Sequence, residues 1–367
     1  MEYQQLKFFE KNNRIPGGCG VAGIVNVKGN LFSGENIITS ICTMNERGNG
    51  LGAGYAGYGI YPEFKDNWCF HIMYDDIRAK EIVEDFLEDG FDIVNEEPIP
   101  VHRVKTLQYI PLLYRYFIDI KRDKNSQELY DQQEYILSTI MKINKNFDGA
   151  YVFSSGKNMG IFKGVGEPEE IGDFYRISDY KGYIWTAHNR FPTNTVGWWG
   201  GAHPFGILDW SVVHNGEISS YGINRRYLEN AGYYCTLFTD TEVITYLFDL
   251  LYRRHQLDFN IIGNILSSPF WEMIDREEKE KMEFLKALRI IYAPALLNGP
   301  FAIIVANSDT VIGLNDRIKL RPLVSAERGD FVYLASEESA IRCVCKLPEN
   351  VWMPEAGEPV VVQIKRV

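Results

Sequence analysis

The first candidate for chemistry in this chain is Cys19, which stands in the glycine-rich stretch 16–25. A cysteine thiolate is a strong nucleophile, and glycines at 17, 18 and 20 leave the backbone on both sides of the sulfur open to close approach. The apolar run at 21–27 follows directly and predicts a buried strand. Because a lone cysteine is more often a small core residue, this stretch needs partners elsewhere in the chain before it indicates a catalytic site.

Five residues in later loops could supply those partners. An arginine can hold a carboxylate through two hydrogen bonds, and a buried aspartate can pair with an ammonium group. A side-chain amide next to a glycine N–H offers the two donors that an oxyanion hole requires. With a cysteine nucleophile, such a set fits an amino acid that bears a side-chain acyl group. The residues are Arg190, His203, Asn215, Gly216 and Asp240.

Each of these residues also has a purely structural interpretation. Asn215-Gly216 alone is more typical of a turn, and Asp240 alone is more typical of a helix N-cap. Arg190 could pair with a surface carboxylate, and His203 could be a hydrogen-bonded loop residue. Only the combination of all five with Cys19 favours a functional site.

Hydrophobic periodicity and turn signals predict the elements that must position these residues. Strands are predicted at 21–27, 51–61, 68–74, 182–188, 210–214, 300–306, 311–314, 331–335 and 360–364. Helices are predicted at 35–45, 79–87, 127–143, 225–231, 243–252 and, with breaks, 257–293. Because regular βαβ alternation is missing, the pattern favours an α+β fold with antiparallel sheets and outer helices.

Some local details are predicted within this pattern. Residues 30–33 return antiparallel on 21–27, and 150–154 forms a hairpin with 159–162. Asn224 caps the helix at 225–231, and an Asp or Thr of the stretch 239–242 caps the next helix. Cys343 and Cys345 would lie on a strand as reduced core or edge residues, since no histidine or second cysteine pair nearby completes a metal site.

Composition narrows the class of protein. The chain has 367 residues, of which 46% are hydrophobic and 24% charged, enough for a sizeable core. Its net charge of -11 and pI of about 5.2 argue against sequence-independent nucleic-acid binding, which needs a basic face. No apolar run is long enough for a transmembrane helix, and residues 1–14 lack an apolar signal core. We therefore expect a cytoplasmic protein without membrane or nucleic-acid partners.

The order of the motifs resembles a known family, the class II glutamine amidotransferases of the N-terminal-nucleophile hydrolases. The resemblance covers most of residues 19–345, with 66–146 poorly covered, and it is closest to the amidotransferase domain of glutamate synthase in its separate, short-chain form. The matching segments are Cys19-Gly20-Val21-Ala22-Gly23-Ile24, Arg47-Gly48, His188-Asn189-Arg190-Phe191 with Thr193, His203-Pro204-Phe205, His214-Asn215-Gly216-Glu217, Thr239-Asp240-Thr241-Glu242-Val243, Gly299-Pro300-Phe301-Ala302, Arg317 with Leu320-Arg321-Pro322-Leu323, and Ala335-Ser336-Glu337-Glu338.

The resemblance implies a fold, a reaction and roles for seven residues. The fold is a four-layer αββα sandwich of two antiparallel sheets, formed by residues 19–367 with a partly helical insertion at about 66–146. The reaction is hydrolysis of L-glutamine to glutamate and ammonia through a cysteine thioester. The implied catalytic residues are Cys19, Asn215 and Gly216, and the implied substrate-binding residues are Arg190, Asp240, His203 and Gly48.

In the family that this chain resembles, the free α-amine of the cysteine is the general base. An α-amine titrates near pH 8 and can act near neutrality, whereas an amide nitrogen cannot. Residues 1–18 precede Cys19, so removal of methionine cannot expose its amine. We therefore expect residues 1–18 to be a leader or propeptide cleaved at Gly18–Cys19, through attack of the cysteine on the Gly18 carbonyl. A chain that is never processed is the alternative.

The resemblance also bears on cofactors and partners. The chain shows no flavin-binding barrel, iron–sulfur spacing or nucleotide fingerprint, so we expect no cofactor and no metal in it. Ammonia needs an acceptor, and we expect a synthase partner, the flavin-containing glutamate synthase subunit, to carry the flavin and iron–sulfur centres. Three alternatives stay open: a subunit for a different ammonia acceptor, a non-catalytic glutamine-sensing or scaffold subunit, and an amide hydrolase for other substrates.

Overall fold

Strand β1 (Gly20–Asn26), which follows Cys19, lies inside a seven-stranded antiparallel sheet. The structure is a computed structural model that describes residues 18–122, 124, 128–191 and 197–365. All seven residues of β1 are buried, as its apolar sequence predicts. The sheet order is β17 (Asn350–Trp352), β15 (Val324–Arg328), β16 (Phe331–Ala335), β1, β10 (Ile184–Asn189), β3 (Ala53–Tyr58) and β8 (Met159–Gly164).

A second, five-stranded antiparallel sheet lies face to face with the first. Its order is β11 (Phe205–Ile207), β12 (Trp210–Gly216), β13 (Phe301–Ala306), β14 (Thr310–Asn315) and β18 (Val360–Gln363). The sheets approach closely at Gly23 of β1, where an added Cβ atom would lie 3.2 Å from Ile304 Cγ2. The apolar side chains between the sheets form one of the two buried clusters of the protein.

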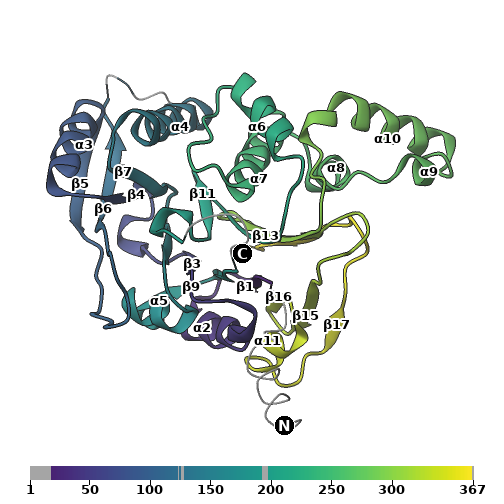
Figure 1. Cartoon of the computed structure of the whole chain (residues 1–367), viewed down its shortest axis with the longest axis horizontal. Helices are drawn as coiled ribbons and strands as arrows, with labels where there is room; N and C mark the ends of the chain where they lie inside the picture. The colour runs from purple at the N-terminus through teal and green to yellow at the C-terminus, as the bar shows by residue number, and fades with distance from the viewer. Residues whose placement is uncertain (1–17, 123, 125–127, 192–196, 366–367) are drawn as a thin grey trace, which may run out of the picture.

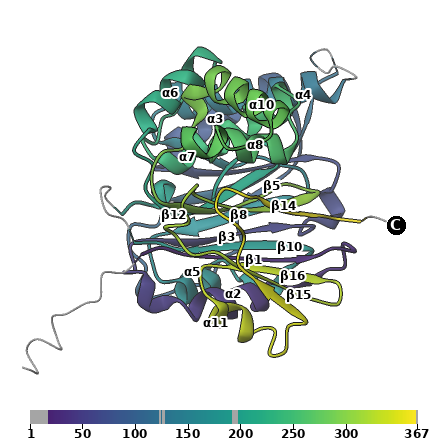
Figure 2. The same ribbon diagram turned by 90° about the vertical axis from the view of Figure 1, so that its right-hand side faces the viewer.

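Helices cover the outer faces of both sheets, as Figure 2 shows edge-on. The first sheet is covered by α2 (Glu35–Cys42), α5 (Pro168–Phe174) and α11 (Glu338–Arg342). The second is covered by α6 (Tyr221–Asn230), α7 (Asp240–Phe248), the π-helical η5 (Asp249–Arg254) and α8 (Phe259–Leu266), with α9 (Trp271–Ile274) and α10 (Lys279–Ile291) beyond them (Figure 1). This arrangement confirms the α+β fold and its αββα layers.

The block at 66–146 contains a sheet as well as helices. Its elements are β4 (Trp68–Tyr74), α3 (Ile77–Gly90), β5 (Phe91–Pro98), β6 (Leu112–Ile120) and α4 (Leu129–Asn146). Together with β7 (Ala150–Ser154) the strands form a four-stranded sheet of order β5-β6-β4-β7. Strand β7 packs beside β11, so this sheet adjoins the five-stranded one. That the block is an insertion, and that residues 1–18 are a leader, stay predictions.

Two predicted strand pairings are wrong. β7 pairs with β4 and β8 pairs with β3, so 150–154 and 159–162 do not form a hairpin. The connection crosses between sheets, because the Gly156 and Asn158 carbonyls accept from the N–H groups of Cys69 and Gly59. Strand β2 (Phe32–Ser33) pairs with β9 (Lys181–Gly182) instead of β1, since β10 and β16 already occupy both edges of β1.

Two predicted side-chain positions are also wrong. Helix α6 begins at Tyr221, and the Asn224 amide inside it donates to the carbonyls of Pro294 and Leu296 at 2.6 and 3.1 Å. Neither Cys343 nor Cys345 is on a strand: Cys343 is the exposed C-cap residue of α11, and Cys345 is buried after the end of this helix. All six cysteines are free thiols. Thr239 caps α7 as expected, accepting from Thr241 N.

Among the residues that the structure describes, no helix is both long and apolar enough to span a membrane.

The buried Tyr58 hydroxyl links the two sheets and provides a test of their packing. It lies 2.8 Å from Ser211 Oγ and 2.9 Å from the Ala306 carbonyl oxygen, both on the second sheet. We predict that Tyr58→Phe lowers the free energy of unfolding by about 1–3 kcal/mol, because it leaves buried polar atoms without a partner. Urea denaturation would measure this, with the exposed Tyr109 as a control site, where Tyr109→Phe should change little. An unchanged midpoint for Tyr58→Phe would contradict the prediction.

Candidate functional site

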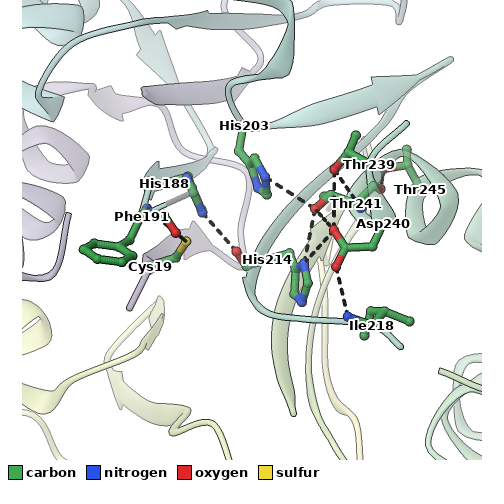
Figure 3. A network of polar contacts seen from close by, with 10 residues as sticks. All are labelled: Cys19, His188, Phe191, His203, His214, Ile218, Thr239, Asp240, Thr241 and Thr245. Atoms are coloured by element: carbon green, nitrogen blue, oxygen red, sulfur yellow. Dashed lines mark hydrogen bonds and ion pairs between the residues drawn. The ribbon is translucent and has the colours of Figure 1, made fainter. Parts of the chain in front are cut away.

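Antiparallel pairing of β1 with β10 positions the candidate nucleophile. Gly20 is opposite Asn189 in the register, so Cys19 meets the residues that follow β10. The Phe191 backbone N–H donates to Cys19 Sγ at 3.2 Å (Figure 3). The chain therefore brings Cys19 directly beside Arg190, although the two are far apart in sequence.

Cys19 opens onto a cavity of about 460 Å³ that gathers five of the seven predicted site residues. The ends of β1, β10, β12 and β13 and the starts of α6 and α7 contribute to its walls. Its volume lies within the usual range for small-ligand sites. The predicted residues that line it are Cys19, Arg190, His203, Gly216 and Asp240, joined by Phe191, His214, Glu217, Ile218, Ser219, Tyr221, Phe238, Thr239, Gly299 and Pro300.

Asp240 is held as an anion at the first residue of α7. Its Oδ2 accepts from Ile218 N at 3.0 Å, and its Oδ1 lies 3.6 Å from His214 Nδ1. Burial pushes the pKa of Asp240 upward, but His214 and the hydrogen bonds from Ile218 and Thr241 outweigh it and leave the pKa below its ordinary value. A carboxylate fixed in this way suits a cationic group of a ligand.

Arg190 and Cys19 shift each other's titration. Burial lowers the pKa of Arg190, while the sulfur and Asp240 act in the opposite direction. Burial also raises the pKa of the Cys19 thiol, against the hydrogen bond from Phe191 and the charge of Arg190. Cys19 is thus held as the neutral thiol, and its use as a nucleophile requires a base.

The two candidate oxyanion donors lie at the end of β12. Asn215 is 1% exposed and does not line the cavity. It lies close to Gly18, since a Cβ atom added to Gly18 would be 3.7 Å from Asn215 Oδ1. Gly216 has a φ of 153°, and a Cβ atom there would lie 2.0 Å from the Pro300 carbonyl oxygen. Only glycine fits at this position without a shift of the backbone.

Gly48 lies against β10, outside the lining of the cavity. A Cβ atom on it would be 2.0 Å from Asn189 Oδ1, so glycine allows the loop to approach the strand. The preceding Arg47 donates through Nε to the Cys19 carbonyl at 3.1 Å and pairs with Glu337 at 2.6 Å. This segment therefore holds the backbone of the nucleophile.

Sequence reasoning assigned no separate role to three buried residues of this site, His188, His214 and Thr241. The His203 and His188 rings stack at 3.9 Å, and Thr241 Oγ1 lies 3.2 Å from His214 Nδ1 (Figure 3). Burial lowers the pKa of His188 to about 3 and that of His203 well below its ordinary value, so both rings are neutral. In the sequence, these three residues lie within two positions of predicted site residues, and this proximity is the signal that could have identified them.

Two predicted features lie outside the described residues, the leader segment 1–17 and Thr193. Within the described part of the chain, no group of three or more His, Cys, Asp or Glu residues is arranged to hold a metal ion.

Gly216 offers a stability test with an internal control. We predict that Gly216→Ala lowers the free energy of unfolding by about 1–3 kcal/mol, because alanine is strained at this φ and clashes with Pro300. Gly222 in α6 has nothing within 4 Å of its Cβ direction, so Gly222→Ala should be neutral or stabilising by up to about 1 kcal/mol. Chemical denaturation of both variants would decide, and equal effects would contradict the clash.

Comparisons with known proteins find the same family that the sequence motifs resemble. A family model described as glutamine amidotransferases class-II matches residues 76–235. A protein of Archaeoglobus fulgidus named "Uncharacterized protein" is 50% identical over 95% of this chain and 92% of its own length. A protein of Methanothermobacter thermautotrophicus named "Putative glutamine amidotransferase" is 27% identical over 90% of this chain and 95% of its own.

Among solved structures, the chain is similar to the glutamine phosphoribosylpyrophosphate amidotransferase from B. subtilis. The match has 16% identity and a TM-score of 0.47, and it covers 94% of this chain. The chain spans about half the length of that protein, 47% of it.

Proposed function

Because this chain belongs to the class II glutamine amidotransferases, we propose that it hydrolyses L-glutamine to glutamate and ammonia through a thioester on Cys19. The observation that carries the proposal is the cavity of about 460 Å³, which has a thiol, a buried arginine and a half-buried aspartate on its walls. These groups match the side-chain amide, the α-carboxylate and the α-ammonium of a free amino acid.

Binding of glutamine follows from the charges of the site. The guanidinium of Arg190, 5% exposed, would hold the α-carboxylate through paired hydrogen bonds. The ionised Asp240 would hold the α-ammonium, since it lies in the same cavity. Fixing both α-groups of the amino acid leaves its side-chain amide free to reach Cys19. The thiol and the amide carbonyl then react as groups already held in position.

The chemistry then needs a base, two oxyanion donors and water. The free α-amine of Cys19 takes the thiol proton, and the thiolate attacks the amide carbonyl. Asn215 and the Gly216 N–H stabilise the tetrahedral oxyanion. The amine returns its proton to the leaving nitrogen, so ammonia departs and a thioester remains. Water activated by the same amine opens the thioester, which releases glutamate and restores the thiol.

This mechanism requires that the Gly18–Cys19 peptide bond is cleaved. The raised pKa of the buried thiol supports the need for a nearby base, and an amide nitrogen cannot serve as one. Gly18 lies beside Asn215 and Arg321, the latter 3.4 Å from its Cβ direction, so the peptide ahead of the nucleophile is seated within the site. Attack of Cys19 on the Gly18 carbonyl, followed by hydrolysis of the resulting thioester, would release residues 1–18.

Processing can be measured directly on active protein. We predict that intact-mass analysis finds a chain that begins at Cys19, and that Cys19→Ser or Gly18→Pro retains the leader or loses it more slowly. Full glutaminase activity from a chain that still carries Met1 would contradict this prediction.

The catalytic role of Cys19 has a matched control in the chain. We predict that Cys19→Ser lowers ammonia release from glutamine by roughly a thousandfold or more, whereas Cys343→Ser, at an exposed cysteine far from the cavity lining, leaves it unchanged. Hydrolysis of asparagine to ammonia and of acylated amines to the free amine should be far slower, because Arg190 and Asp240 would select a free amino acid of glutamine length. Equal ammonia release by the Cys19→Ser variant would contradict the role of Cys19 as the nucleophile, and a wild-type protein that releases none would favour a sensing or scaffold role.

We further propose that the ammonia passes to a synthase partner of the glutamate synthase kind. The family implies glutamine as substrate and an acceptor for its amide nitrogen. The order and type of the motifs support the glutamate synthase partner, whose flavin-containing subunit would hold the cofactors. A subunit that serves a different acceptor is the second candidate, and purification of the native complex would distinguish the two.

A further inference from the structure

Two short backbone segments lie between the glutamine cavity and a second cavity. Each of them leads to a residue that lines the glutamine cavity. The turn η4 (Trp199–Gly201) leads to His203, and the irregular segment 236–239 leads to Asp240. On their other side, Trp198, Trp199, Thr236 and Leu237 line a larger cavity of about 1000 Å³. Segments placed between two cavities receive less packing than the core, so other contacts must hold them.

Lys163 anchors the first of these segments. It stands at the end of β8 and is 0% exposed, which is rare for lysine. Its Nζ donates to the Gly200 carbonyl in η4 at 2.9 Å and lies 4.3 Å from the centre of the Phe205 ring. Burial lowers the pKa of Lys163 well below its ordinary value, while the charge of Glu242 acts against that shift.

Glu242 anchors the second segment. It is 1% exposed on α7, and its two carboxylate oxygens accept the N–H groups of Thr236 and Leu237 at 3.0 Å each. Tyr246 donates its hydroxyl to the same carboxylate at 3.1 Å. Burial raises the pKa of Glu242 to about 7, opposed by the hydrogen bonds from Leu237, Thr236 and Tyr246 and by Lys163.

We propose that Lys163 and Glu242 are a pair of positioning residues that hold the two segments in place and so determine the affinity for glutamine. Neither side chain lines the glutamine cavity, and each bonds to backbone three or four residues before His203 or Asp240, which do. Apolar side chains of similar size in these buried positions would stabilise the fold equally well or better. Stability of the fold therefore does not explain why the two residues are ionisable. The proposal rests on the proposed function for its kinetic readout.

Kinetics of ammonia release provide the first test. Lys163→Met removes the donor to Gly200, and Glu242→Gln keeps the shape but turns one acceptor into a donor that faces a backbone N–H. Loosened segments populate the binding geometry less often, so the glutamine KM should rise about tenfold in each variant, with kcat changed by less than about twofold. The surface pair of the same residue types, Lys281 and Glu277, supplies the controls Lys281→Met and Glu277→Gln, which should match the wild-type enzyme.

Hydrogen exchange provides a readout that needs no catalysis. In the Lys163→Met protein, exchange should quicken in 198–202, and in the Glu242→Gln protein it should quicken in 236–240, with β13 unaffected in both. In a double variant that lacks both ionisable groups, thermal stability should recover relative to the single variants, while the KM stays raised.

The outcomes separate the two proposals. An unchanged KM in an active Lys163→Met or Glu242→Gln enzyme would overturn the positioning role, as would faster exchange spread evenly over the chain. A wild-type protein that releases no ammonia would count against the proposed function instead. The exchange pattern would then still decide whether the two residues hold these segments.

Discussion

The antiparallel pairing of β1 with β10 is the constraint on which the site depends. It places Cys19 beside the residues after Asn189 and lets the Phe191 N–H bond the sulfur. A slip of one residue in this register would turn every side chain of β1 to the opposite face of the sheet and so disrupt the packing on both faces. The buried apolar strand and the position of the nucleophile are therefore set by the same interaction.

Burial decides the electrostatics around this nucleophile. It raises the pKa of Cys19, lowers the pKa values of His188 and His203, and leaves Asp240 charged only because donors surround its carboxylate. Because burial lowers the pKa values of His188 and His203, these two rings are weak bases for the neutral thiol. This supports the proposed role of the Cys19 α-amine as the base, and with it the proposed cleavage of the Gly18–Cys19 bond.

Two kinds of contact hold the residues of the site in position. Glycines at 48 and 216 leave room for the Asn189 side chain and the Pro300 carbonyl, which a Cβ atom at these positions would block. Behind them, Lys163 and Glu242 bond to the backbone of segments that have a cavity on either side. Precise positioning of binding residues on loops requires such support, because small displacements reduce affinity and rate steeply.

The sequence by itself determined the class of the fold and the residue types on which the proposed chemistry depends. The types and order of Cys19, Arg190, Asn215 and Asp240 indicate an amino-acid amide as substrate, and strand periodicity is a local property, so most strands were predictable. Seven residues were predicted for the site, and five of them share one cavity.

Only the tertiary structure decided which segments meet. The pairing of β7 with β4, the use of Asn224 inside a helix, and the contacts of Lys163 and Glu242 all join segments from separate elements. No local pattern encodes such contacts, because a strand edge or a buried amide finds its partner only when the layers pack. Lysine and glutamate residues usually lie on the solvated surface, so the residue types alone predict no role in the site. The packing of the layers buries Lys163 and Glu242 and brings them against the backbone of the two segments.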